Sequence, residues 1–129
     1  MDAQGHELLN LGANAEGLAV MDFIDKRGSK RITIGSDAGS NPAVSLNDAE
    51  GRERLALMMH PQMGPSLAML DAKRGARILL FSVQDGPSAL GFTDAEGKRR
   101  LELGVNPDGS SRLTVLDNKE KVLFQAPPE

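Results

Sequence analysis

The sequence contains no cysteine, tryptophan or tyrosine, and only four of its 129 residues are phenylalanine. Without cysteine the chain can form no disulfide, thiolate metal site or thiol nucleophile. With so few aromatic rings it nearly lacks the stacking platforms on which proteins bind bases and sugars. No apolar run reaches the roughly 18 residues of a membrane-spanning helix, and no signal-peptide pattern opens the chain. We therefore expect a chain that is soluble as given, with peripheral membrane association left open.

The charge is mild, with 15 basic and 18 acidic side chains and a formal net charge of −3. This balance argues against a nucleic-acid partner, which requires a strongly basic surface. The hydrophobic content of 40% is sufficient for one core, so residues 1–129 are expected to form a single domain.

An aspartate recurs every 23 residues along the whole chain, at Asp2, Asp25, Asp48, Asp71, Asp94 and Asp117. A glycine follows three residues later in four of the six units, at Gly5, Gly28, Gly51 and Gly97. In the fourth unit the glycine comes one place late, at Gly75, and the sixth unit has Glu120 instead. Such periodicity indicates one supersecondary unit repeated along the chain.

Large apolar residues occupy fixed places on both sides of each aspartate. Of 22 positions that lie two or four residues before it, or seven or nine after it, 21 hold a large apolar residue. Within each unit these residues alternate with polar or small ones, which is the period of a half-buried strand. Asp-x-x-Gly between two such strands is typical of a tight hairpin turn, in which glycine takes a positive φ.

The sequence therefore predicts an all-β fold, an antiparallel meander of about eleven strands built from 23-residue β-hairpin repeats and curled into a shallow pseudo-symmetric barrel. Gly28, Gly51 and Gly97 are expected at positive φ, and Arg74 and Gly75 in a shifted or enlarged turn. An odd number of strands prevents simple antiparallel closure. The seam either stays partly open, closes irregularly or is covered where chains associate through their edge strands.

The stretch from Leu90 to Leu103 follows an L-x-D-x-x-G-x-x-R-x-L consensus of tandem hairpins at its centre, with Asp94, Gly97 and Arg100. Its counterparts extend through nearly the whole chain, which thus resembles the bacterial proteins described as the β-flower fold, shallow barrels with hairpin petals around an apolar centre. The resemblance implies no enzymatic activity. The similarity of such barrels to Tubby-like barrels implies lipid or membrane association.

A barrel of eleven strands is wider than its side chains fill, so either the barrel flattens until its side chains fill the interior, or its apolar centre is open to a ligand. The seven-residue segments that run from each repeat aspartate to the sixth residue after it hold 14 bases and 11 acids, a net charge of +3. The rest of the chain has 1 base and 7 acids, a net charge of −6. We therefore expect non-enzymatic binding of a hydrophobic ligand, lipid or anionic membrane. The candidate lining is Phe23, Leu46, Met69 and Phe92, and the candidate headgroup ligands are Lys26, Lys30, Arg52, Lys98 and Arg99.

Three alternatives remain open. The protein could be a structural or assembly module that binds another chain through its apolar face or open edge, and Arg31, Arg54, Arg77 and Arg100 could form an outer column that pairs with neighbouring acids. Soft ligands for Cu(I) are present at one turn, in Met58, Met59, His60 and Met63. The favoured interpretation is that these side chains form a flexible apolar edge that packs on a neighbour or contacts lipid. Calcium at the repeat aspartates is disfavoured against turn capping. No catalytic residue or cofactor is expected, since His6 and His60 fit no catalytic arrangement. Ligand, oligomeric state, compartment and any preceding segment are open.

Overall fold

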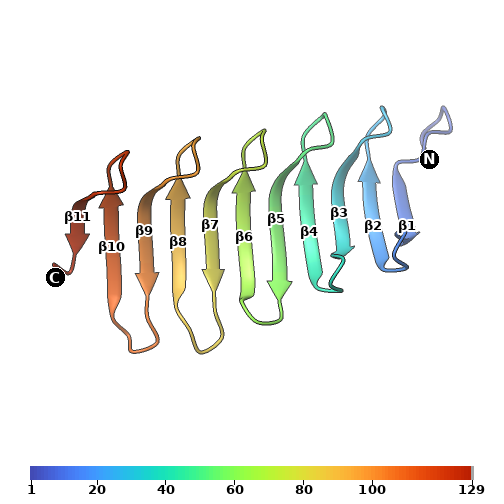
Figure 1. The fold of residues 1–129 in the computed structure, drawn as a ribbon. Helices are drawn as coiled ribbons and strands as arrows, with labels where there is room; N and C mark the ends of the chain where they lie inside the picture. Colours follow the sequence, from blue (N-terminus) through green and yellow to red (C-terminus); the bar gives the residue numbers. More distant parts are fainter. Residues whose placement is uncertain (129) are drawn as a thin grey trace.

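The computed structural model describes residues 1–128 and consists of eleven β-strands in one sheet (Figure 1). In chain order the strands are β1 (Leu9–Ala13), β2 (Ala19–Ile24), β3 (Lys30–Ser36), β4 (Pro42–Asn47), β5 (Glu53–His60), β6 (Gly64–Leu70), β7 (Ala76–Ser82), β8 (Ser88–Thr93), β9 (Arg99–Val105), β10 (Ser111–Leu116) and β11 (Val122–Ala126). Residues 1–128 contain no helix. The predicted all-β class and strand number are confirmed.

The sheet is an uninterrupted meander in which every strand pairs antiparallel with its sequence neighbours, in the order β1 to β11. The first and last strands lie at opposite ends of the row in Figure 1, so the seam is open. Over the described residues, strands contact only the strands next to them in the sequence. Residues 1–128 therefore supply no second layer over either face of the sheet.

The strand register places the periodic apolar residues in two rows across one face. Residues directly opposite each other in an antiparallel pair share a face. One row consists of Leu9, Phe23, Ile32, Leu46, Leu55, Met69, Ile78, Phe92, Leu101, Val115 and Phe124. The other consists of Leu11, Met21, Ile34, Val44, Leu57, Leu67, Leu80, Leu90, Leu103, Leu113 and Ala126. We call this surface the apolar face, and the opposite surface the polar face.

The Asp-x-x-Gly turns, which join even to odd strands, form one rim of the sheet. In the turn at Asp25 the amide of Asp25 donates to the Ser29 carbonyl oxygen at 2.9 Å, and the Gly28 amide donates to the Asp25 carbonyl at 2.9 Å. The Asp25 carboxylate accepts the amides of Arg27 and Ser29. These hydrogen bonds hold the pKa of Asp25 below its usual value. Glycine is suited to the third position after the aspartate because φ is positive there.

The turn glycines behave as predicted, with φ values of 81° at Gly28, 74° at Gly51 and 80° at Gly97. The prediction of a shifted or enlarged turn at the fourth aspartate is wrong. Arg74 occupies the glycine position with φ of 67°, and its amide donates to the Asp71 carbonyl as Gly28 does at Asp25. Because the Asp71 carboxylate caps the Lys73 and Gly75 amides, the turn keeps its size and the arginine takes the unfavourable conformation.

Replacing Arg74 with glycine should therefore stabilise the protein. Glycine adopts the left-handed backbone conformation without the cost of about 1 kcal/mol that arginine incurs. Part of this gain is offset because glycine increases the conformational entropy of the unfolded chain. We expect a gain of roughly 0.5 kcal/mol in the free energy of unfolding, measured by urea titration. Arg27→Gly is the control, because Arg27 lies in the equivalent turn without a positive φ. An equal gain in both variants would contradict this explanation.

Candidate functional site

The apolar face is exposed over its whole length, and it is the most unusual surface of the molecule. None of its 22 side chains is buried. Two that lie near its middle, Leu57 and Leu80, are each 47% exposed. The only buried apolar residues among those described, Val20 and Ala56, belong to the polar face. The layer that would normally cover such a face is therefore not supplied by residues 1–128.

The predicted lining residues do lie together on the apolar face. Phe23, Leu46, Met69 and Phe92 occupy alternate strands of one row, from β2 to β8. With strands about 4.8 Å apart, the eleven strands extend the face over about 48 Å, and two side-chain rows give it a width of about 15 Å. The resulting strip of about 700 Å² exceeds the few hundred Å² of contiguous apolar surface that a monomeric protein usually exposes.

The polar face carries an ion pair with a buried carboxylate near one end of the sheet. Asp22 is 1% exposed, and its Oδ2 lies 2.6 Å from Nζ of Lys30. The Thr33 hydroxyl donates to Oδ1 at 2.7 Å. Burial raises the pKa of the Asp22 carboxyl, but the contacts with Lys30 and Thr33 outweigh it, so that the pKa lies below its ordinary value. The Asp22 carboxyl group is therefore ionised at neutral pH.

Two of the predicted headgroup ligands reach towards the polar face. Lys30 does so through its ion pair with Asp22, and Arg99 lies 3.2 Å from Glu102. Both acids belong to rows on the side of the sheet opposite the apolar residues. The structure therefore separates these two cations from the lining with which they were grouped.

The other predicted headgroup ligands lie on the Asp-x-x-Gly rim. Arg52 contacts Asp48 and Glu50 at 2.9 Å each, and Lys98 lies 3.2 Å from Glu96. Lys26 makes no ion pair with any of residues 1–128. Since two of these three cations have acidic partners within the chain, the rim attracts an anionic surface less strongly than its bases suggest.

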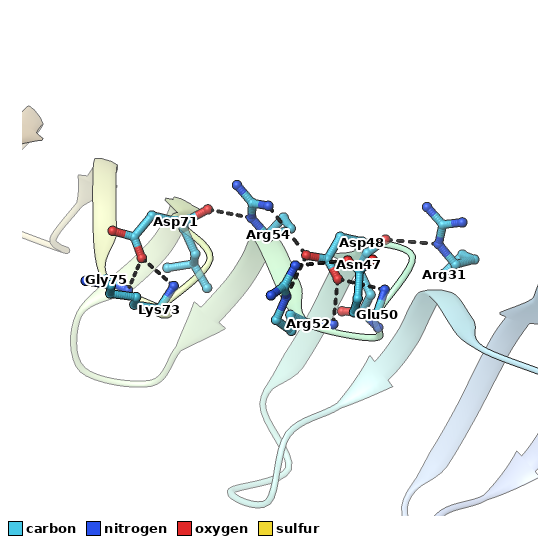
Figure 2. Close-up of polar contacts among 10 residues, drawn as sticks. Arg31, Asn47, Asp48, Glu50, Arg52, Arg54, Asp71, Lys73 and Gly75 are labelled. Atoms are coloured by element: carbon cyan, nitrogen blue, oxygen red, sulfur yellow. Dashed lines mark hydrogen bonds and ion pairs between the residues drawn. The ribbon is translucent and has the colours of Figure 1, made fainter. Parts of the chain in front are cut away.

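The arginines six residues after the repeat aspartates form a column, and three of them link one hairpin to the next. Each is the extra residue of a β-bulge, because the register skips Arg31, Arg54, Arg77 and Arg100 in turn. Arg31 Nε donates to the Asn47 carbonyl at 3.1 Å and Arg54 Nε to the Leu70 carbonyl at 2.9 Å (Figure 2). Arg77 makes the same contact with the Thr93 carbonyl.

Arginines of this column also form ion pairs with the repeat aspartates of their own turns. Arg31 lies 3.4 Å from Asp25, Arg54 3.5 Å from Asp48 and Arg100 2.5 Å from Asp94. Figure 2 shows Asp48 between Arg52 and Arg54, with its carboxylate also accepting backbone amides. The expected outer column of charge pairs is therefore present at these three arginines, and two of them, Arg31 and Arg54, also join neighbouring hairpins through their backbone contacts.

The methionine-rich tip does not assemble its soft ligands. Met58 and Met59 are successive residues of β5 and so project from opposite faces of the sheet. The His60 Nδ1 atom accepts the amides of Gln62 and Met63 at 3.3 Å each, which occupies the nitrogen within the turn. Among residues 1–128, no three His, Asp or Glu side chains are grouped in a manner suited to a metal ion.

A hollow on the polar face was missed by the sequence reasoning. It has a volume of about 330 Å³ and lies over β7 to β10, with Gly91 and Gly104 among its lining residues. Leu79 and Phe81 line one side, and Arg112 lies on the other side. The signal was available, since Leu79 and Phe81 are large apolar residues at repeat positions that hold Thr33, Ala56 and Gly35 in other units.

The comparisons with known proteins show a resemblance of fold. No protein-family model and no curated protein matches the chain. One similar solved structure is S. aureus TarM, a mutant in complex with fondaparinux, α-GlcNAc-glycerol and UDP; the superposition has a TM-score of 0.50 at 7% sequence identity. It covers 81% of this chain and 21% of TarM, so the chain spans about a fifth of that protein. At this identity the likeness concerns the fold alone.

Residues 1–128 include no helix of the length and apolar character needed to cross a membrane. The surface that stands out among the described residues is a long apolar strip on one face, framed by two rims of turns. The arginine column adds contacts between hairpins, and the polar face adds an ion pair and a hollow.

Proposed function

We propose that the protein is a non-enzymatic assembly module whose apolar face binds the apolar β-sheet face of another protein chain. The observation that carries this proposal is that 22 aligned side chains are uncovered on a face that no other strand of the described chain reaches. Two sheets that stack face to face at about 10 Å interdigitate such rows and form the core of a β-sandwich. The partner would supply the second layer that this chain lacks.

Binding of a lipid or an anionic membrane is the second candidate. The wide aliphatic face and the +3 segments around the repeat aspartates favour it. The ion pairs of Lys30, Arg52, Lys98 and Arg99 weaken it, since these cations already have acidic partners in the chain. A membrane would also need the cations and the apolar face on the same side, whereas Lys30 and Arg99 reach the polar face.

Native mass spectrometry of the purified protein after mild extraction distinguishes the two candidates. An assembly module should appear as a protein complex of fixed stoichiometry, and a lipid binder as one chain with the mass of a lipid. The decisive variant is Leu80→Asp, which places a charge on the apolar face, where Leu80 is 47% exposed. We expect it to dissociate the complex.

The matched control is Leu79→Asp. Leu79 is the neighbouring residue of β7, is 37% exposed and projects from the polar face. It should leave the complex intact. Equal disruption by both variants would mean that the charge acts on folding and not on the face. Monomers with bound lipid, together with co-sedimentation with anionic liposomes at low salt, would reject the assembly proposal in favour of lipid binding.

A further inference from the structure

The two rims of the apolar face differ in their basic residues. The Asp-x-x-Gly turns, residues 2–6, 25–29, 48–52, 71–75, 94–98 and 117–121, hold eight lysines and arginines beside nine acids, and six of these eight bases make no ion pair within residues 1–128. The turns of the opposite rim contain Glu16, Asp37, Asp85 and Asp108, and residues 14–18, 37–41, 61–63, 83–87 and 106–110 include no lysine or arginine. Within residues 1–128 none of these four acids makes an ion pair. We call these turns the acidic rim.

We infer that the partner of the apolar face is a second copy of this chain, stacked so that the Asp-x-x-Gly rim of each copy lies over the acidic rim of the other. This inference rests on the proposed function, because it names the occupant and its orientation. The only symmetry that exchanges two identical faces in this way is a two-fold axis that lies between the sheets and runs perpendicular to the strands. It places β6 over β6 and each strand over its own counterpart.

The area of the face suits such a dimer. A specific stable interface buries about 800 Å² per partner, which is close to the strip of about 700 Å² estimated above. A two-fold interface must also be self-complementary, and the repeat provides this. Because the apolar rows continue without a gap from β1 to β11, each row of one copy meets a row of the same spacing in the other.

Electrostatics selects between the two possible face-to-face orientations. With an axis parallel to the strands, like rims would overlie each other, and with the perpendicular axis opposite rims do. Stacked sheets lie about 10 Å apart, which is close to the Debye length of about 10 Å at 0.1 M salt, so charges across the interface are only partly screened. Lys26, Arg27, Lys73, Arg74, Lys119 and Lys121, which make no ion pair within residues 1–128, are available to the partner's acids.

Cysteine cross-linking tests the orientation without background, because the chain has no cysteine of its own. Ala72 lies on the Asp-x-x-Gly rim and Gln84 on the acidic rim, both exposed and both in turns that adjoin β7. Ala72→Cys and Gln84→Cys leave every charge in place. The two full-length variants are prepared separately, mixed under conditions that allow exchange of subunits, and treated with a short bifunctional maleimide.

If the rims are opposed, the mixture of the two variants should form a covalent dimer. Neither variant treated alone should form one. Each variant alone is thus the matched control for the other. Cross-linking of Ala72→Cys to itself, or of Gln84→Cys to itself, would overturn the orientation and leave the assembly function standing. A complex with a different protein but no dimer of this chain would overturn the second copy as partner. A monomer that carries lipid would instead overturn the proposed function.

Discussion

Replacing Gly64 with alanine should lower the free energy of unfolding by about 3 kcal/mol, the largest effect we expect from a single methyl group. Gly64 begins β6 with φ of 74°, a conformation that L residues rarely adopt. A Cβ atom at this position would come against the Ser82 carbonyl oxygen at the end of β7. Because the obstacle is backbone, it can yield only if the neighbouring strands shift.

Gly109→Ala separates the two contributions. Gly109 has φ of 82°, and no atom lies within 4 Å of the Cβ that alanine would add. This variant should therefore lose only the conformational part, about 1 kcal/mol. Urea titrations of both variants provide the measurement. Equal losses at the two positions would show that the approach of Ser82 to Gly64 costs nothing.

Replacing Lys30 with methionine should cost about 2 kcal/mol at neutral pH, since it leaves the Asp22 carboxylate buried without its cation. The removal of one member of a fully buried pair costs roughly 3–5 kcal/mol, and we reduce this figure because the Lys30 side chain is 57% exposed. Asp22→Asn combined with Lys30→Met removes both charges. The double variant should recover part of the loss.

The destabilisation caused by Lys30→Met should depend on pH. In the natural chain the pKa of Asp22 is lowered from 3.8, so the pair stabilises the fold above that pH and the contribution is lost as the pH falls through the folded pKa. Without Lys30, burial dominates and raises the pKa of Asp22. The penalty in Lys30→Met should then shrink as the pH is lowered towards that raised pKa. A loss that is the same at pH 7 and pH 4 would contradict this account.

The strand pattern could be predicted from the sequence because its physical basis is local. Residues two apart along a strand share a face, and a tight turn fixes which residues are opposite each other. The 23-residue period then determines the rows that contain Phe23 and Met21. Whether a second layer covers those rows depends on how twist accumulates over eleven strands and on contacts with other chains. The 23-residue repeat carries no information about either.

The positions of the basic residues were harder to predict because of the bulges. Strict alternation from Ile32 would place Lys30 on the apolar side, as the predicted grouping with Phe23 requires. Arg31 is inserted between them, so that Lys30 pairs opposite Ile24 and turns to the polar face. The same insertion at Arg100 turns Arg99 towards Glu102. A bulge of one residue cannot be read from hydrophobic periodicity alone.

Since each strand of the described chain, residues 1–128, contacts only its sequence neighbours there, the sheet behaves as a one-dimensional array. Its stability is the sum of hairpins and of the junctions between adjacent hairpins, including those made by the arginine column. One 23-residue unit could therefore be gained or lost by unequal recombination, with every remaining junction unchanged. The length of the apolar face can in this way be adjusted in steps of two strands, so that evolution can match the area of an interface to its partner without redesigning a core.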